Sequence, residues 1–260
     1  MLLVPFFQNV AADFKAAAAA AFSVDAIDVA GSNDYLTRGA DLTGLADGKA
    51  GTLSVWVRVD GGDTAQRVIF ILNSGTGTSG LACQLLPTTN KLDIAGRNAA
   101  GTVILQMRTT PAYAAGTTWL NILASWDLAG SVNHLYVNDA APALDIDTAT
   151  DDTIDYTKGN AGVAARTDGS FDWNGCIAEV FFHTTYIDLS SEANRRLFIS
   201  ATGKAVDLGA DGSTPLGVQP LVYLHLNDAQ DPTEFAVNLG TGGSYANTGT
   251  IETCDSSPLD

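Results

Sequence analysis

The sequence predicts an all-β protein, an antiparallel jelly-roll β-sandwich with a short N-terminal helical arm and one late helix. The clearest observation is the segment 52–60, where Leu53, Val55, Val57 and Val59 alternate with polar or aromatic residues. A period of two marks a strand with one face in a core. Strand-like segments follow one another without intervening helices, which excludes a parallel βαβ sheet. The linkers are rich in Gly, Asp, Asn and Thr, as hairpin turns require.

Residues 1–22 are predicted to form the helical arm. An alanine run extends from Ala16 to Ala21, and alanine has the highest intrinsic helix propensity. The larger apolar residues before the run recur at helical spacing and form one stripe: Phe6, Phe7, Val10 and Phe14. Two interpretations remain open. The stripe packs on its own domain, or it docks onto a partner.

Residues 23–202 are predicted to form the sandwich. Eight segments have the apolar patterns of strands: 52–60, 67–72, 81–86, 91–96, 102–108, 119–126, 134–139 and 171–183. A helix is predicted over 189–201, with Asp188 or Ser190 as its N-cap. The remaining zone, 203–260, is a Gly/Thr/Asp-rich C-terminal extension that is predicted to contribute one strand, 220–226, to the sandwich.

The charge balance is strongly acidic. Lys and Arg number 13 against 29 for Asp and Glu, which gives a formal net charge of −16. Such a surface repels phosphate backbones and anionic lipid headgroups, so nucleic-acid and membrane partners are not expected. No uninterrupted apolar run approaches the ~18 residues that a spanning helix needs.

The cysteines and the N-terminus favour synthesis in a cytoplasm. Cys83, Cys176 and Cys254 include no C-x-x-C pair, so we interpret them as small buried side chains and do not expect a disulfide-stapled fold. A single bridge remains compatible with the sequence. The first residues lack the basic start of a signal peptide, and the chain has no N-x-S/T glycosylation acceptor.

Four segments, in this order, resemble the laminin-G-like, concanavalin A-like lectin/glucanase jelly roll. They are GSNDYL (31–36), TLSVWVRV (52–59), WLNILASWDLAGSVNHLYVND (119–139) and FDWNGCIAEVFFHTTYIDLSSEANRRLF (171–198). The resemblance spans roughly residues 26–200, and it implies a sandwich whose loops are available for ligands.

The C-terminal region has a narrower resemblance. The segments GKAVDLGADGSTPLGVQPLVYLHLND, NLGTGGSYANTGTIE and SSPLD are similar to the ends of structural proteins from tailed bacteriophages and related particles. This resemblance implies a virion protein, such as a fibre, spike or decoration protein.

The enzyme hypothesis fails on its motif. The glucanase branch of this family supplies its catalytic carboxylates as E-x-D-x-x-E on one strand, because retaining hydrolysis needs two carboxylates close together. The nearest segments here offer Asp145 and Asp147 without a Glu, or Glu179 alone. We therefore expect no catalytic residues and no enzyme. No G-x-S-x-G elbow is present for a serine hydrolase either.

Two further motifs have structural interpretations. GTGTSG (75–80) matches G-x-G-x-x-G, but a strand-like segment follows it where a dinucleotide site needs a helix, so we predict a hairpin loop. His134, His183 and His225 each lie alone in strand-like segments, without a second His or Cys at zinc-ligand spacing.

Calcium and glycan contacts are the remaining site hypotheses. No cofactor is expected, although the acid-rich segment 145–155 and the Asn33-Asp34 turn carry the oxygen ligands that calcium prefers. Trp173, in the FDWNG turn, is the candidate glycan-binding residue because it is the most loop-like tryptophan. Trp56, Trp119 and Trp126 lie in strands, where core packing is the default.

These observations lead to one functional hypothesis and its alternatives. We expect a non-enzymatic virion structural protein of a tailed phage or phage-like particle, made in the host cytoplasm. Its arm is expected to bind other virion proteins, and bacterial surface glycans are candidate ligands of its sandwich. A homo-oligomer is expected because particle appendages are symmetric. The alternative is a secreted bacterial carbohydrate-active enzyme or carbohydrate-binding module. A third possibility is a sandwich that binds no sugar and cements neighbouring subunits.

Overall fold

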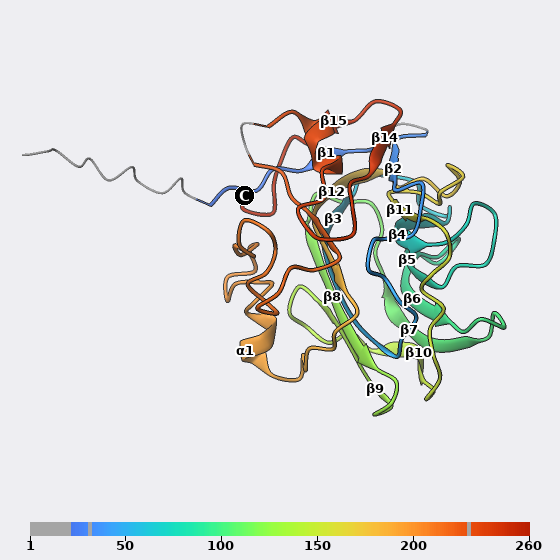
Figure 1. Cartoon of the computed structure of the whole chain (residues 1–260). Coiled ribbons are helices and arrows are strands. Elements are labelled where there is room, and N and C mark those ends of the chain that lie inside the picture. Colours follow the sequence, from blue (N-terminus) through green and yellow to red (C-terminus); the bar gives the residue numbers. More distant parts are fainter. Residues whose placement is uncertain (1–21, 31–32, 228–229) are drawn as a thin grey trace, which may run out of the picture.

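The computed structural model describes residues 22–30, 33–227 and 230–260, and these form two antiparallel β-sheets packed face to face (Figure 1). The predicted all-β sandwich is therefore confirmed. Helix within these residues is confined to α1 (Glu192–Arg195) and the 3-10 helix η1 (Pro232–Ala236). The arm predicted over 1–22 lies outside the described residues, except for Phe22. No helix of the described residues has the length and hydrophobicity to cross a membrane.

The first sheet has seven strands in the described part of the chain. Their order is β15 (Glu252–Thr253), β1 (Ile27–Asp28), β12 (Gly175–His183), β3 (Ala50–Val59), β8 (Leu120–Asp127) and β9 (Val132–Val137), with β13 (Val222–Leu224) also paired to β12. The alternation predicted for β3 is confirmed: Leu53, Val55, Val57 and Val59 all lie in the main core. The opposite face of β3 carries Trp56, which is buried in a separate cluster.

The second sheet has eight strands within the described ranges. Their order is β10 (Leu144–Ala149), β7 (Val103–Ala112), β6 (Lys91–Arg97), β5 (Leu81–Leu85), β4 (Arg67–Leu72), β11 (Ala161–Val163), β2 (Tyr35–Thr37) and β14 (Ala246–Thr248). Each of the eight segments predicted as strands between 52 and 183 overlaps an observed strand of one sheet or the other. The six strands that were not predicted are short or polar: β1, β2, β10, β11, β14 and β15.

The main core fills the space between the two sheets. Trp126 and Tyr156 are fully buried there, and the Trp126 Nε1–H donates a hydrogen bond to the Tyr156 hydroxyl at 2.7 Å. That hydroxyl in turn donates to the carbonyl of Ala50 at 3.0 Å. Gly51 is required beside this pair, because a Cβ at that position would lie 2.5 Å from the Trp126 ring. The polar atoms of the Trp126–Tyr156 pair are therefore satisfied, as burial demands.

The outer face of the seven-stranded sheet is covered by the chain's own later segments. Phe181 and Phe198 pack there at 5.2 Å between ring centroids, so the segment around α1 is fixed on the sheet. Near the other end of the sheet, Phe22 and Leu259 pack against the cluster that contains Trp56. Both ends of the described chain therefore lie on this side of the molecule, as Figure 1 also shows.

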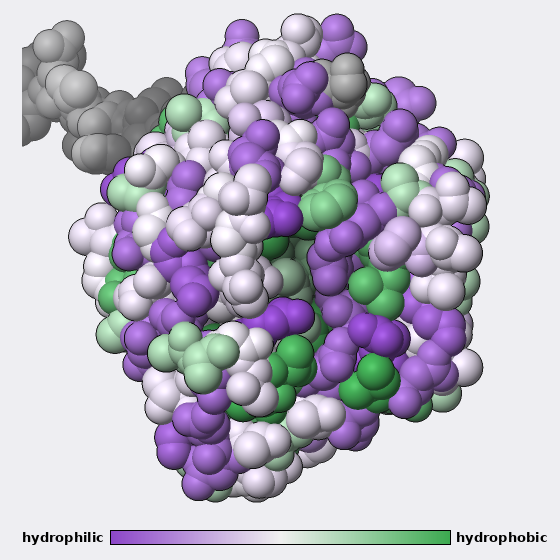
Figure 2. Space-filling model, turned by 90° about the vertical axis from the view of Figure 1, so that its right-hand side faces the viewer, coloured by the Kyte–Doolittle hydropathy of each residue, from purple (hydrophilic) through white to green (hydrophobic). Residues whose placement is uncertain are grey.

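The outer face of the eight-stranded sheet has no such cover. Figure 1 shows loops projecting from its rim but no helix or strand layered on it. One small buried apolar cluster lies on this face, formed by Val68, Ile71 and Ala82. Figure 2 views the molecule from this side and shows a hollow near the middle of the face, with hydrophobic residues inside it and hydrophilic residues around it.

The late helix is shorter than predicted. The sequence indicated 189–201, but α1 spans only Glu192–Arg195, and no side chain caps its N-terminus. The following residues form turns, and Ile199 pairs with Ala205 in an isolated bridge. The helix ends early because the Ile199–Ala205 bridge and the packing of Phe198 on Phe181 fix the following residues in a non-helical conformation.

The extension 203–260 is woven into both sheets. The sequence predicted one strand there, and β13 overlaps it, but β14 and β15 also come from this segment. β14 pairs with β2 in one sheet and β15 pairs with β1 in the other. The extension thereby closes one end of the sandwich.

A disulfide joins Cys176 of β12 to Cys254, which follows β15, across 78 residues of sequence. The expectation of three unpaired cysteines is therefore wrong for two of them, and Cys83 alone is free and buried. The pairing of β15 and β12 on either side of β1 brings these distant cysteines together. No local spacing could have signalled this.

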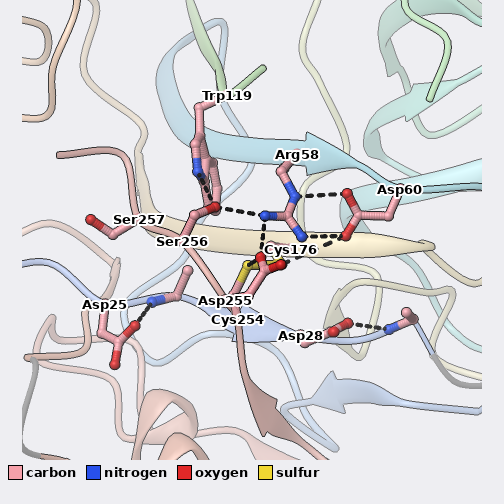
Figure 3. The surroundings of a disulfide bond; sticks show 12 residues. Asp25, Asp28, Arg58, Asp60, Trp119, Cys176, Cys254, Asp255, Ser256 and Ser257 are labelled. Carbon is pink, nitrogen blue, oxygen red and sulfur yellow. Dashed lines mark hydrogen bonds and ion pairs between the residues drawn. A yellow bond between two sulfur atoms is a disulfide. The ribbon is translucent and has the colours of Figure 1, made fainter. Parts of the chain in front are cut away.

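Charged and polar groups gather around the disulfide (Figure 3). The guanidinium of Arg58 forks onto Asp60, with bonds of 2.7 and 2.8 Å, and also pairs with Asp255. Ser256 accepts a hydrogen bond from Arg58 at 2.6 Å and another from Trp119 at 3.1 Å. The C-terminal segment is therefore attached to β3 as well as to β12.

Candidate functional site

A groove of about 310 Å³ lies on the open outer face of the eight-stranded sheet. Ile71 of β4 lies at its floor, and the β4–β5 loop from Thr76 to Ser79 forms one wall. Gln66, Gln84, Arg97 and Arg166 supply the polar lining. This volume lies at the lower end of the range typical of small-molecule sites.

Strand alternation explains why the groove can form. Ala82 of β5 pairs with Ala95 of β6 in the register of the sheet, and both side chains are buried. Ala82 packs with Ile71 in one small buried cluster, and the longer Gln84 and Arg97 side chains of the neighbouring positions line the groove. Asp93, Ala95 and Arg97 follow one another at the two-residue spacing that places side chains on one face.

A ladder of polar side chains crosses this face. Gln66 donates to Gln84 at 2.7 Å, and Gln84 donates to Asp93 at 3.4 Å. Gln106 and Arg108 each donate to the same carboxylate at 2.9 Å. Asp93 is only 2% exposed, so its negative charge is held by these donors. The ladder fixes the amides of Gln66 and Gln84 at the edge of the groove.

Arg166 holds the loop that walls the groove. Its Nη2 donates to the carbonyls of Gly75 and Gly77 at 2.8 and 2.9 Å. Gly80 ends the loop, and a Cβ there would lie 1.7 Å from the carbonyl oxygen of Asp155. The G-x-G-x-x-G motif is therefore a hairpin loop between two strands, as predicted, and no helix follows it.

The aromatic residue of the FDWNG turn that faces solvent is Phe171, and the candidate Trp173 is buried. Trp173 is 1% exposed and packs in the main core, so it cannot serve as a surface platform for a sugar. Phe171 is 38% exposed, and the Arg166 guanidinium lies 5.4 Å from its ring centroid. The backbone of Phe171 also accepts a hydrogen bond from Val68 on the groove face of β4.

The candidate calcium ligands are engaged elsewhere. Part of the acid-rich segment 145–155 is the edge strand β10, not a loop, and Asp145 pairs with Lys91 while Asp151 pairs with Lys49. Asp34 accepts a hydrogen bond from the backbone of Thr250 at 2.8 Å. The described residues contain no group of three or more His, Cys, Asp and Glu side chains that could hold a metal ion.

Glu179 lies in the other sheet, away from the groove. It occupies an irregular step in the pairing of β12 with β3 and has a left-handed φ of 51°. Its carboxylate contacts His225 and accepts a hydrogen bond from the Tyr223 hydroxyl at 3.1 Å. His225 borders a second cavity, of about 460 Å³, that Asp207 and Glu234 also line.

The other two histidines have no shared site either. His134 contacts the Tyr186 hydroxyl at 3.0 Å, and burial lowers its pKa. His183 lies at the end of β12, where burial lowers its pKa and its Nδ1 has no partner among the described residues.

Two stacked antiparallel sheets, one covered by its own chain and the other open and hollowed, define a jelly-roll domain of the lectin type. The chain belongs to the concanavalin A-like lectin/glucanases superfamily, whose family model matches residues 30–191. The family expected from the sequence is thus confirmed.

Two solved structures illustrate the similarity. A candidate carbohydrate-binding protein from Bacteroides ovatus aligns with a TM-score of 0.59 and 18% identity, over 90% of this chain and 61% of that one. A heptameric SAP-like pentraxin from Limulus polyphemus aligns with a TM-score of 0.56 and 10% identity, over 89% and 95%. The chain spans about three fifths of the length of the Bacteroides protein. At these identities the likeness concerns the fold. No curated protein matches the sequence.

Proposed function

We propose that this protein is a non-catalytic glycan-binding domain that holds one or two sugar units of a larger glycan in the groove on β4, β5 and β6. The observation that carries the proposal is the Gln66–Gln84–Asp93 ladder, which fixes amide groups at the rim of an open hollow. Sugars present many hydroxyl groups, and binding sites for them need several polar groups already in place.

The apolar parts of the face suit the same ligand. Sugar rings have C–H faces that pack on apolar or aromatic surfaces, while their hydroxyls find donors and acceptors. Ile71 supplies an apolar floor, and Phe171 supplies an exposed ring beside Arg166. The candidate carbohydrate-binding protein of the same fold from Bacteroides ovatus supports this assignment.

The groove lacks the machinery for hydrolysis. Glycosidases place two carboxyl groups about 5–9.5 Å apart across the scissile bond. None of the described residues that line the groove is acidic. The neighbouring Asp93 is buried and paired with Arg108, so it is not available as an acid or nucleophile. We therefore expect binding without turnover.

A glycan array followed by calorimetry tests the proposal. The array identifies a glycan bound by the native protein, and calorimetry compares it with Gln84→Ala and Gln219→Ala. Gln84 lines the groove, whereas Gln219 bonds to Leu239 in the extension. Q84A is expected to weaken binding at least tenfold, and Q219A to leave it unchanged. Equal affinity of all three proteins, or the absence of any glycan ligand, would contradict the proposal. Incubation with β-glucans is expected to release no reducing sugar.

The disulfide bears on where the domain works. Disulfides persist in extracellular, periplasmic and virion-surface settings and are rare in cytosols. The Cys176–Cys254 bond supports a location outside a reducing cytoplasm. Both a virion protein that binds host glycans and a secreted carbohydrate-binding module fit this setting, whereas a purely cytoplasmic role does not.

The virion assignment remains a prediction from the C-terminal segments. Antibodies against the folded domain should label purified particles if it is a virion protein, with other virion proteins as its partners. Recovery only from particle-free culture medium would contradict the assignment and favour the secreted module. Light scattering of the purified protein tests the predicted homo-oligomer.

A further inference from the structure

The cations of this acidic protein are mostly neutralised. The sequence has 13 Lys and Arg residues, of which all but Lys15 are described. Eight of the described cations are paired with carboxylates: Lys49, Arg58, Arg67, Lys91, Arg108, Lys158, Arg195 and Arg196. The four that have no carboxylate partner among the described residues are Arg38, Arg97, Arg166 and Lys204.

Two of these four unpaired cations line the groove. The Arg97 side chain extends from the end of β6 and makes no hydrogen bond or ion pair with any described residue. Arg166 spends two donor bonds on the loop carbonyls, but its Nε is buried and has no hydrogen-bond partner among the described residues. Because this Nε is shielded within the fold, a ligand in the groove would meet the Nη side of the Arg166 guanidinium.

The groove therefore differs in charge from the rest of the surface. The whole chain has a formal net charge of −16, yet the lining described above contains two arginines and no acid. The nearest ladder carboxylate, Asp93, is already paired with Arg108. The two arginines are the charged residues of the described lining, so a ligand in the groove lies directly beside positive charge.

We propose that the groove selects an acidic sugar, one whose ring carries a carboxylate, and that Arg97 and Arg166 bind this carboxylate. The inference rests on the proposed glycan-binding function and specifies its ligand class. Guanidinium groups match carboxylates through paired N–H donors, and such charge-assisted bonds are stronger than bonds between neutral groups. Ile71 then faces the less polar side of the ring, and the Gln66 and Gln84 amides are left for hydroxyls.

Oligogalacturonate and its fully methyl-esterified form test the charge requirement, because they share one sugar skeleton and differ in the carboxylate. By calorimetry, the native protein is expected to bind the acid at least tenfold more tightly than the ester. Arg97→Gln should abolish this preference, whereas Arg97→Lys should keep part of it. Because the Arg97 side chain has no partner among the described residues, both variants should melt like the native protein. Lys204→Gln is the matched control, since it removes an unpaired cation from the turn between Ile199 and Ala205 on the covered sheet.

The outcomes distinguish failure of the acidic-sugar inference from failure of the glycan-binding proposal. Equal affinity for acid and ester, with binding still sensitive to Gln84→Ala, overturns the acidic-sugar inference and leaves the glycan-binding proposal intact. A preference that survives Arg97→Gln, or that falls equally in Lys204→Gln, also overturns it. A sulfated oligosaccharide that binds as tightly as oligogalacturonate would replace carboxylate selection with general anion binding. If no acidic or neutral glycan binds, the proposed function fails together with the inference.

Discussion

Glu179 meets the imidazole of His225 at the irregular step in β12, where Glu179 is 3% exposed. Burial raises the pKa of the Glu179 carboxyl above its ordinary value, although the hydrogen bond from His225 opposes this effect. Burial alone would lower the pKa of His225, but the hydrogen bond and charge of Glu179 outweigh it, and that pKa is raised. The pair therefore holds protons more firmly in the folded chain than in the unfolded chain.

This pair should make stability fall as pH rises. A group whose folded pKa is raised contributes stability that is fully present below its unfolded pKa and is lost as pH rises through its folded pKa. Glu179→Gln resembles the protonated acid in shape, so it should match the native protein near pH 4 and become relatively more stable toward pH 8. Urea unfolding of both proteins across this range measures the difference. A constant difference between them would contradict the pairing.

Phe171 and Trp173 should respond in opposite ways to truncation. Phe171→Ala is expected to weaken glycan binding roughly tenfold, because an aromatic contact contributes about 0.5–1.5 kcal/mol beyond its buried area. Its melting temperature should stay close to native, since the ring is 38% exposed. Trp173→Ala should instead lower the free energy of unfolding by about 3–5 kcal/mol, as for other buried aromatic residues. Calorimetry and urea unfolding on both variants separate the two roles, and reversed effects would refute this assignment.

Thiol titration should give a different number of reactive thiols for the native, the denatured and the denatured and reduced protein. Burial raises the pKa of the Cys83 thiol, so the native protein should react with no thiol reagent. In denaturant one thiol should react, and after reduction all three should. Reduction should also lower the free energy of unfolding by about 2–5 kcal/mol, because the bond closes a long loop of the unfolded chain. Three reactive thiols in denaturant before reduction would disprove the Cys176–Cys254 bond.

Removal of divalent cations should leave the fold unchanged. The carboxylates of Asp34, Asp145 and Asp151 already have partners within the chain, and calcium sites need six to eight free oxygen ligands. The melting temperature is therefore expected to be the same in EDTA and in excess calcium chloride. A rise of several degrees with calcium would point to a cation site that these contacts do not reveal.

The sheets were easier to predict than the site. Strands such as β3 and β4 were recognised because their apolar patterns are local properties of the sequence. Short strands such as β11 depend on neighbours that lie far away in the chain, so no local pattern marks them. The disulfide depends in the same way on Cys254 returning to β12.

The groove could not be found from the sequence because its residues come from separate strands. Gln84 lies on β5, Arg97 ends β6 and Arg166 follows β11, so they come together only when these strands align on either side of β4. The choice of Trp173 shows the same difficulty on a smaller scale. Phe171 and Trp173 share one turn, and the sequence does not tell which ring enters the core. The exposed ring proves to be the smaller one, at a residue with a left-handed φ of 61°.

The position of the two ends of the described chain has a practical consequence for how such a domain can be mounted. Phe22 and Leu259 both pack behind the covered sheet, on the far side from Arg97. A support joined at the C-terminal end would therefore leave the hollowed side pointing outward and unobstructed. Immobilisation on a sensor chip by a C-terminal tag should preserve full ligand capacity, whereas coupling through a cysteine introduced at the groove rim should not.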